Sequence, residues 1–182
     1  MPNFDDARRN SPLLQAAFEL ARRGHDGQFR KHGPPYIEHP VAVAKRLWEL
    51  SGAMDEELVA AAFLHDTLED TEVTRGEIAT ACGARVLRLV EAVTRSKTMP
   101  KPEYLAHLKD APADVKALKV ADRTENLRDV VGLGDVAFAK RYAEETEQFL
   151  LRLADEVPAG LGRGLREALE NAKALSQSVI AR

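Results

Sequence analysis

Three features of the sequence predict an all-α fold for this chain. Apolar residues recur at the spacing of an amphipathic helix in several segments, for example at Leu14, Ala17, Phe18 and Ala21. Typical helix start and stop signals bound these segments. The sequence contains no clear two-residue alternation, no internal repeat and no low-complexity run. We therefore expect a bundle of helices.

The first half of the chain predicts three helices and one long loop. Ser11 followed by Pro12 is typical of a helix start, because serine caps exposed N–H groups and proline suits the first turn. Residues 24–38 are rich in glycine and proline and predict a loop. A second helix is expected from about Pro40 to Leu50, and Asp55 is placed to cap a third.

The second half predicts further helices. Thr74 and Glu77 have the spacing of a capping box, in which each side chain bonds the main chain of the other residue. A helix is expected to start at Pro112 and to end before Gly132. Asp135 is expected to cap a segment that runs through Glu156, and a break from Pro158 to Gly164 is expected before the last helix.

Length and composition predict one globular domain. The chain has 182 residues, of which 45% are hydrophobic and 30% charged. We expect a single domain over residues 1–182, with a core over about 12–156 and a C-terminal helix over about 160–181. The formal net charge of −3 argues against a general nucleic-acid binder, which is usually basic.

The sequence also predicts a cytoplasmic protein without a membrane partner. Residues 1–10 are polar and lack the apolar stretch of a signal peptide. No run approaches the roughly 18 apolar residues that suggest a membrane span. The single cysteine, Cys82, excludes an intrachain disulfide and is expected to be a small buried residue. Nothing in the sequence indicates the oligomeric state.

One short segment carries most of the chemical information. His65-Asp66 ends an apolar run, and Glu69-Asp70 follows directly. Residues four apart share a helix face, so both acidic residues would lie one turn from the His-Asp pair if the helix continues that far. Neutral imidazole and carboxylate together suit a divalent transition metal. Four such groups at the end of an apolar run predict an active site.

Two more residues can complete a ligand set. His39 precedes Pro40, where an extended residue is followed by a helix start. Asp122 lies in an apolar segment of helical spacing, where a carboxylate is costly to bury unless it is paired or bound to a metal. With His65 and Asp66, these residues predict a mononuclear metal site that leaves positions open for water and substrate.

Several motifs occur together in one order. They are Gly27-Gln28-Phe29-Arg30-Lys31, Pro35-Tyr36-Ile37-Glu38-His39-Pro40, His65-Asp66-Thr67-Leu68-Glu69-Asp70-Thr71, Val93-Thr94, Lys97-Thr98, Lys119-Val120-Ala121-Asp122-Arg123 and Asn126-Leu127-Arg128. In this order and spacing, over roughly residues 12–150, the chain resembles the HD-domain hydrolases of the RelA/SpoT type, in particular the short, stand-alone alarmone hydrolases. The resemblance implies an HD-domain helical bundle with a mononuclear metal site.

The resemblance also implies roles for individual residues. The ion would be Mn²⁺, while the ligand types alone also admit Zn²⁺ or Fe²⁺. Glu69 and Asp70 would handle the attacking water. The family's substrate positions match Arg30, Lys31 and Lys97 for the pyrophosphate, Asn126 near the ribose and Tyr142 near the nucleotide.

The expected activity is metal-dependent hydrolysis of ppGpp or pppGpp to GDP or GTP and pyrophosphate. Because a metal site recognises phosphate rather than base, an adenosine alarmone, (pp)pApp, and the 2′-phosphate of NADPH are alternative substrates. A non-catalytic alarmone-binding module is a further alternative, which the intact His-Asp and Glu-Asp pairs disfavour. Phe29 stands where the family often has a basic residue. Phe138 stands where the nearest relatives have an arginine, for which Lys140 or Arg141 could substitute.

Overall fold

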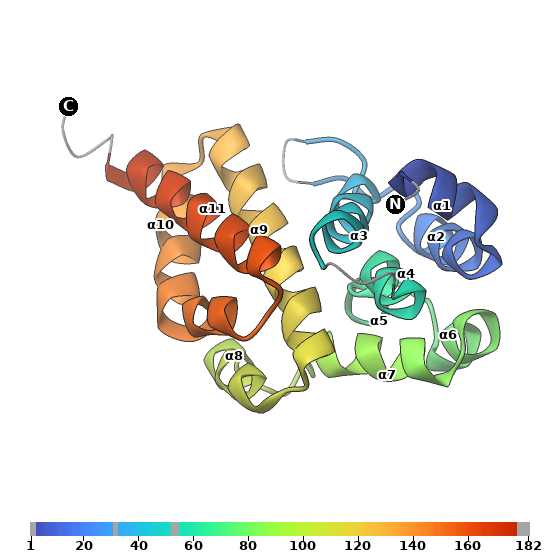
Figure 1. The fold of residues 1–182 in the computed structure, drawn as a ribbon. Coiled ribbons are helices and arrows are strands. Elements are labelled where there is room, and N and C mark those ends of the chain that lie inside the picture. The colour runs from blue at the N-terminus through green and yellow to red at the C-terminus, as the bar shows by residue number, and fades with distance from the viewer. Residues whose placement is uncertain (1–2, 31–32, 52–54, 178–182) are drawn as a thin grey trace. The chain divides into compact units, whose positions relative to one another are not determined.

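The structure is a computed structural model that describes residues 3–30, 33–51 and 55–177 (Figure 1). The chain divides into two compact units, residues 1–99 and residues 100–182. The described residues form helices, turns and one isolated bridge between Phe29 and Pro35, without a β-strand. The predicted all-α fold is therefore confirmed. No helix in the described ranges is long and apolar enough to cross a membrane.

Short and medium helices build the described part of the first unit. Their bounds are α1 Phe4–Asn10, α2 Pro12–Gly24, α3 Glu38–Leu50, α4 Glu56–Leu64, α5 Thr67–Asp70, α6 Arg75–Cys82 and α7 Ala84–Val93. α4 packs against α2, α3 and α7, and all of its residues from Leu58 to Leu64 are buried. The Phe63 ring near its end packs against Phe4 and Phe18, with centroids 6.1 and 5.8 Å apart. The end of α4 is therefore anchored in the core.

Local caps explain where three of these helices begin. The Ser11 hydroxyl accepts from the Leu14 N–H, and the Asp55 carboxylate accepts from the Leu58 N–H. Thr74 and Glu77 form the complete capping box. These three predicted starts are confirmed. α3 begins at Glu38 rather than near Pro40, so the proline lies inside its first turn.

The chain does not form one continuous helix through Asp70. α4 ends at Leu64, and the short α5 starts separately at Thr67. The His65 ring N–H donates to the Ala62 carbonyl at 2.8 Å, and the Thr67 hydroxyl donates to the Leu64 carbonyl at 2.7 Å. These side chains take the place of main-chain donors that would continue the helix. The continuous helix that would place Glu69 and Asp70 one turn after His65 and Asp66 is therefore absent.

The second unit is built around the long helix α9. In its described residues the α-helices are α8 Lys101–His107, α9 Ala113–Leu133, α10 Val136–Glu145 and α11 Ala159–Gln177. Two 3₁₀-helices, η1 Leu108–Asp110 and η3 Leu151–Asp155, and one π-helix, η2 Thr146–Leu150, lie between them. α9 packs against α10 and α11. Pro112 precedes α9 and Asp135 caps α10, as predicted. Gly134, with φ +65°, ends α9, so Gly132 lies inside the helix rather than beyond it.

The predicted break from Pro158 to Gly164 is wrong, because α11 begins at Ala159. Gly162, one of the glycines that suggested a break, allows close packing instead. A Cβ atom added to Gly162 would lie 2.1 Å from the Ala154 carbonyl oxygen, inside any allowed contact. Only glycine lets α11 approach the preceding 3₁₀ turn this closely. The segment from Asp135 to Glu156 was predicted as one element, but its α-helix ends at Glu145 and a π-helix follows.

Candidate metal centre and active site

His65 directs one specific ring nitrogen away from the helix. Its Nδ1–H donates to the Ala62 carbonyl, which can only accept, so the neutral ring presents a lone pair at Nε2. His65 is buried, with 3% of its surface exposed. Its position directly after Leu64 places this nitrogen at the end of the core helix α4.

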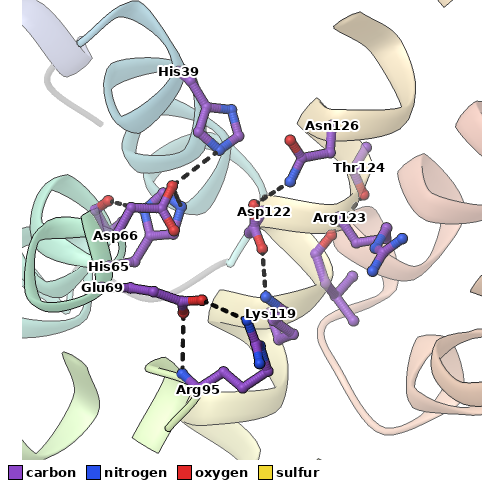
Figure 2. A network of polar contacts seen from close by, with 12 residues as sticks. His39, His65, Asp66, Glu69, Arg95, Lys119, Asp122, Arg123, Thr124 and Asn126 are labelled. Atoms are coloured by element: carbon purple, nitrogen blue, oxygen red, sulfur yellow. Dashed lines mark hydrogen bonds and ion pairs between the residues drawn. The ribbon is translucent and has the colours of Figure 1, made fainter. Parts of the chain in front are cut away.

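Asp66 faces the outward nitrogens of two histidines. Its Oδ2 lies 3.0 Å from His65 Nε2 and 3.9 Å from His39 Nε2 (Figure 2). His39 lies in the first turn of α3 and is buried, and the two imidazole rings pack edge to face with centroids 5.2 Å apart. The three side chains of the first unit therefore converge.

This convergence fits a bound cation. A lone pair and a carboxylate oxygen 3.0 Å apart repel each other unless a proton or a metal ion lies between them. Ligand atoms about 2.1 Å from one ion lie roughly 3–4 Å from each other, which matches both separations from Asp66. Two imidazoles and a carboxylate are also a donor set that suits Mn²⁺, Fe²⁺ or Zn²⁺.

A hydrogen-bonded support holds Asp66 from behind. The Tyr36 hydroxyl donates to Asp66 Oδ2 at 2.7 Å. The Tyr36 ring stacks on His25, with centroids 4.7 Å apart, and His25 Nδ1 lies 2.9 Å from Gln28 Oε1. The Gln28 amide in turn donates to the Asp70 main-chain oxygen at 2.9 Å. The glycine-rich loop thus braces both ends of the segment from Asp66 to Asp70.

The two acidic residues of this segment have different surroundings. Glu69 Oε2 accepts the Arg95 main-chain N–H at 3.2 Å, and Oε1 lies 3.4 Å from the Arg95 guanidinium (Figure 2). Asp70 is more exposed, yet partial burial of its carboxyl, followed by the negative charges of Asp66 and Glu69, raises its pKa. Glu69 is therefore held by a cation, while Asp70 takes up a proton more readily than an ordinary aspartate.

The predicted basic residues of the first unit differ in placement. The Arg30 guanidinium lies 5.7 Å from the centroid of the Tyr36 ring, next to the support of Asp66. Lys97 is exposed in a turn after α7. Lys31 lies outside the described residues.

In the second unit, Asp122 is a buried carboxylate with both oxygens engaged. Lys119 Nζ donates to Oδ2 at 2.7 Å and the Asn126 amide donates to Oδ1 at 2.5 Å, both from the same helix α9. Burial by itself lowers the pKa of Lys119, but the nearby negative charge of Asp122 outweighs it and the net pKa is raised. Lys119 therefore stays charged, and the two hydrogen bonds fix the orientation of the Asp122 carboxylate.

Tyr142 lies in a separate cluster of rings and cations of the second unit. Its ring stacks on Phe138, with centroids 4.6 Å apart. Arg123 and Lys101 lie 4.5 and 5.0 Å from the ring centroid, and Glu145 accepts hydrogen bonds from both. Burial raises the pKa of the Tyr142 hydroxyl. The hydroxyl is thus neutral at physiological pH and available for hydrogen bonding.

Comparison with known proteins decides the family. A family model described as HD domain matches residues 17–158, which is most of the chain. The chain belongs to the HD domain family. The matched range covers His39, His65, Asp66 and Asp122, and it includes residues of both compact units.

Several characterised proteins resemble this HD domain protein over most of its length. Guanosine-3′,5′-bis(diphosphate) 3′-pyrophosphohydrolase MESH1 of Homo sapiens is 38% identical over 165 residues, covering 87% of this chain and 91% of the relative. A guanosine-3′,5′-bis(diphosphate) 3′-pyrophosphohydrolase of Aquifex aeolicus is 40% identical over 148 residues, covering 78% of this chain and 21% of that longer protein. A solved structure described as a metazoan ortholog of SpoT that hydrolyzes ppGpp matches with a TM-score of 0.78 and 25% identity, over 88% of this chain and 95% of that chain.

Sequence reasoning missed three supporting residues of this HD domain. Tyr36 lies in the same motif as His39, but its contact with Asp66 joins residues 30 positions apart. Arg95 follows the Val93-Thr94 motif and reaches Glu69 across 26 positions. Lys119 lies three residues before Asp122, a spacing at which helical side chains meet, so this contact was open to prediction.

Proposed function

We propose that this chain is a metal-dependent 3′-pyrophosphohydrolase of guanosine-3′,5′-bis(diphosphate), releasing GDP from ppGpp or GTP from pppGpp together with pyrophosphate. The observation that carries this proposal is the 38% identity to human MESH1 over 87% of this chain, with the His-Asp motif intact. The small nucleotide is the expected partner. A reducing cytoplasmic location, expected from the single cysteine, belongs to the same proposal.

The proposed ion ligands are His39, His65, Asp66 and Asp122. The convergence of the first three in one unit supports this set. Asp122 is oriented by Lys119 and Asn126 and belongs to the same family match. This assignment treats residues 1–182 as one HD domain that contributes ligands from both units. Mn²⁺ is the proposed ion; when bound, it would lower the pKa of a water molecule and balance phosphate charge.

The proposed reaction divides proton handling between Glu69 and Asp70. Water forms a new bond to the phosphorus attached to the ribose 3′-oxygen, and the bond between that phosphorus and the 3′-oxygen breaks. Glu69, whose charge is balanced by Arg95, orients the water and accepts its proton. Asp70, whose pKa is raised, is suited to give a proton to the departing 3′-oxygen. The products are pyrophosphate and GDP from ppGpp, or pyrophosphate and GTP from pppGpp, in each case with a free 3′-hydroxyl.

The proposed substrate contacts follow charge and shape. Arg30, Lys31 and Lys97 would bind the diphosphate, since a guanidinium can fork two phosphate oxygens and a lysine supplies a point charge. Asn126 would contact the ribose and Tyr142 the nucleotide. Phe138, where the nearest relatives are expected to have an arginine, stacks on Tyr142, and the Arg141 guanidinium lies 4.6 Å from the centroid of the Phe138 ring, so Arg141 could supply the positive charge.

The test is incubation of the purified protein with ppGpp and Mn²⁺, with separation of the nucleotides and an assay for pyrophosphate. We expect GDP and pyrophosphate in equal amounts, and loss of both in a Glu69→Ala/Asp70→Ala variant that still binds Mn²⁺. Parallel reactions use (pp)pApp and NADPH. Orthophosphate released from NADPH, without turnover of ppGpp, would contradict the guanosine assignment. Tight ppGpp binding without hydrolysis would identify a non-catalytic binding module.

A further inference from the structure

Arg95 lies between the end of α7 and the start of the second unit, beside the acidic pair. α7 ends at Val93, Thr94 has extended backbone, and Arg95 follows in a stretch without helix or strand. It contacts Glu69 twice, through its main-chain N–H at 3.2 Å and its guanidinium at 3.4 Å. A third hydrogen bond, from Arg95 Nη1 to the Met99 carbonyl at 3.0 Å, holds the guanidinium in place. All of these residues belong to the first unit. Figure 2 shows the two contacts between Glu69 and Arg95.

These contacts engage both carboxylate oxygens of Glu69. Oε2 receives the main-chain hydrogen bond and Oε1 faces the guanidinium. A carboxylate held at both oxygens by donors keeps one orientation. The two side chains retain 31% and 29% exposure, so solvent reaches the pair and a water molecule can approach Glu69.

Asp70 has a contrasting environment within the same short helix. Its main-chain carbonyl accepts from the Gln28 amide at 2.9 Å, which fixes the main chain of Asp70, whereas Arg95 contacts the side-chain carboxylate of Glu69 directly.

We propose that Arg95 is a positioning residue that holds the Glu69 carboxylate in the orientation in which it accepts the proton of the attacking water. Arg95 acts through Glu69 and need not touch the substrate. This inference rests on the proposed function, and it assigns the reaction a residue that the His-Asp and Glu-Asp motifs do not contain.

The test compares steady-state hydrolysis of ppGpp by the wild type, Arg95→Met and Arg95→Lys. For Arg95→Met we expect kcat to fall about 10- to 100-fold, the range typical of lost supporting contacts. KM and the Mn²⁺ affinity measured without nucleotide should stay within about twofold. Arg95→Lys, which restores a charge without the fork, should recover part of kcat. Because the main-chain N–H remains in each variant, the change isolates the guanidinium.

Two further variants sharpen the comparison. Arg75→Met removes a similar arginine–glutamate pair on the surface of the same unit, where Arg75 Nε donates to Glu91 at 2.8 Å; kcat should not change. In a Glu69→Gln background, Arg95→Met should lower the residual kcat by less than about twofold, since the group through which it acts is already altered.

Each remaining outcome is decisive. A rise in KM with kcat retained would show that Arg95 binds phosphate directly, and an unchanged kcat and KM would show that the contact is structural; either result overturns the inference. An equal fall in kcat in the Glu69→Gln background also overturns it. Failure of the wild type itself to hydrolyse ppGpp would instead refute the proposed function, and the inference with it, so the two failures are distinguishable.

Discussion

At the scale of single residues, the Tyr36 hydroxyl is the contact through which the loop reaches the metal centre. Its hydrogen bond to Asp66 Oδ2, at 2.7 Å, orients a proposed ligand. Tyr36→Phe removes this bond and keeps the ring that stacks on His25. We expect Mn²⁺ affinity to fall about 10-fold with little change in thermal stability, since contacts behind a ligand commonly contribute this much.

Titration of the substrate-free protein with Mn²⁺, in which the concentration of unbound ion is followed, measures the change in Mn²⁺ affinity. Tyr142→Phe is the matched control, because it makes the same chemical change in the aromatic cluster of the second unit. An unaltered Mn²⁺ affinity in Tyr36→Phe would mean that the hydroxyl does not orient Asp66 for the ion.

Residue types and spacing predicted the chemistry better than they predicted the contacts. The His-Asp pair could be recognised because its atoms are adjacent in sequence and its residue types bind metals. Tyr36 and Arg95 could not be assigned, because a tyrosine or arginine has many possible partners and theirs lie 30 and 26 positions away. Only the packing of α3 and α7 against α4 brings such residues together.

At the scale of secondary-structure elements, two glycines of the second unit should respond in opposite ways to the same substitution. Gly162→Ala places a methyl group 2.1 Å from the Ala154 carbonyl oxygen, so α11 must move from η3. We expect the free energy of unfolding to fall by about 1–3 kcal/mol, as in other overpacked sites. Gly132 lies within α9, and a methyl group added there meets no atom of another element. Gly132→Ala should therefore raise the free energy of unfolding by about 0.5–1 kcal/mol.

Urea denaturation of both variants measures the difference. If Gly162→Ala were as stable as the wild type, the close approach of α11 to Ala154 would be absent from the protein in solution.

The capping box of α6 gives a stability effect that depends on pH. The pKa of Glu77 is lowered to about 2. The main cause is the hydrogen bond that its carboxylate accepts from the Thr74 main chain, and the hydrogen bond from the Arg23 side chain comes next. A carboxyl whose pKa is lowered in the folded state stabilises the fold at pH values above its ordinary pKa of 4.5. This contribution disappears as the pH falls from about 4.5 to about 2. Glu77→Gln should therefore be less stable than the wild type at pH 7, and the gap should narrow below pH 4.5.

Denaturation midpoints of the wild type and Glu77→Gln at several pH values between 7 and 3 test this expectation. A gap of constant size across this range would contradict the lowered pKa.

Helix starts were predictable from sequence where a single side chain determines them. Ser11, Asp55 and Asp135 each cap their own helix by bonding an N–H three residues ahead, which is a local interaction. Two other boundaries could not be predicted. The break after Leu64 depends on side chains that compete for carbonyls, and the continuity of α11 through Gly162 depends on a neighbour from η3. Glycine marks a break in an isolated segment but a close contact in a packed one.

At the scale of the whole molecule, the proposed ligand set makes a prediction that involves both units. Trp48 is the single tryptophan and lies in α3 of the first unit, so its fluorescence reports unfolding of that unit. A ligand at 100 times its dissociation constant stabilises the state that binds it by about 2.7 kcal/mol. If Asp122 of the second unit binds the same ion as His39 and His65, Asp122→Asn should remove most of the Mn²⁺-dependent rise in the Trp48 unfolding midpoint.

The comparison needs each variant with and without Mn²⁺, so that the loss of the Lys119 ion pair in Asp122→Asn is separated from the loss of metal binding. Asp110→Asn, at an exposed residue of the same unit, should keep the full Mn²⁺ effect. A full Mn²⁺ effect in Asp122→Asn would mean that His39, His65 and Asp66 hold the ion alone. In that case Asp122 would serve its own helix through Lys119 and Asn126, and the four-residue ligand set would be wrong.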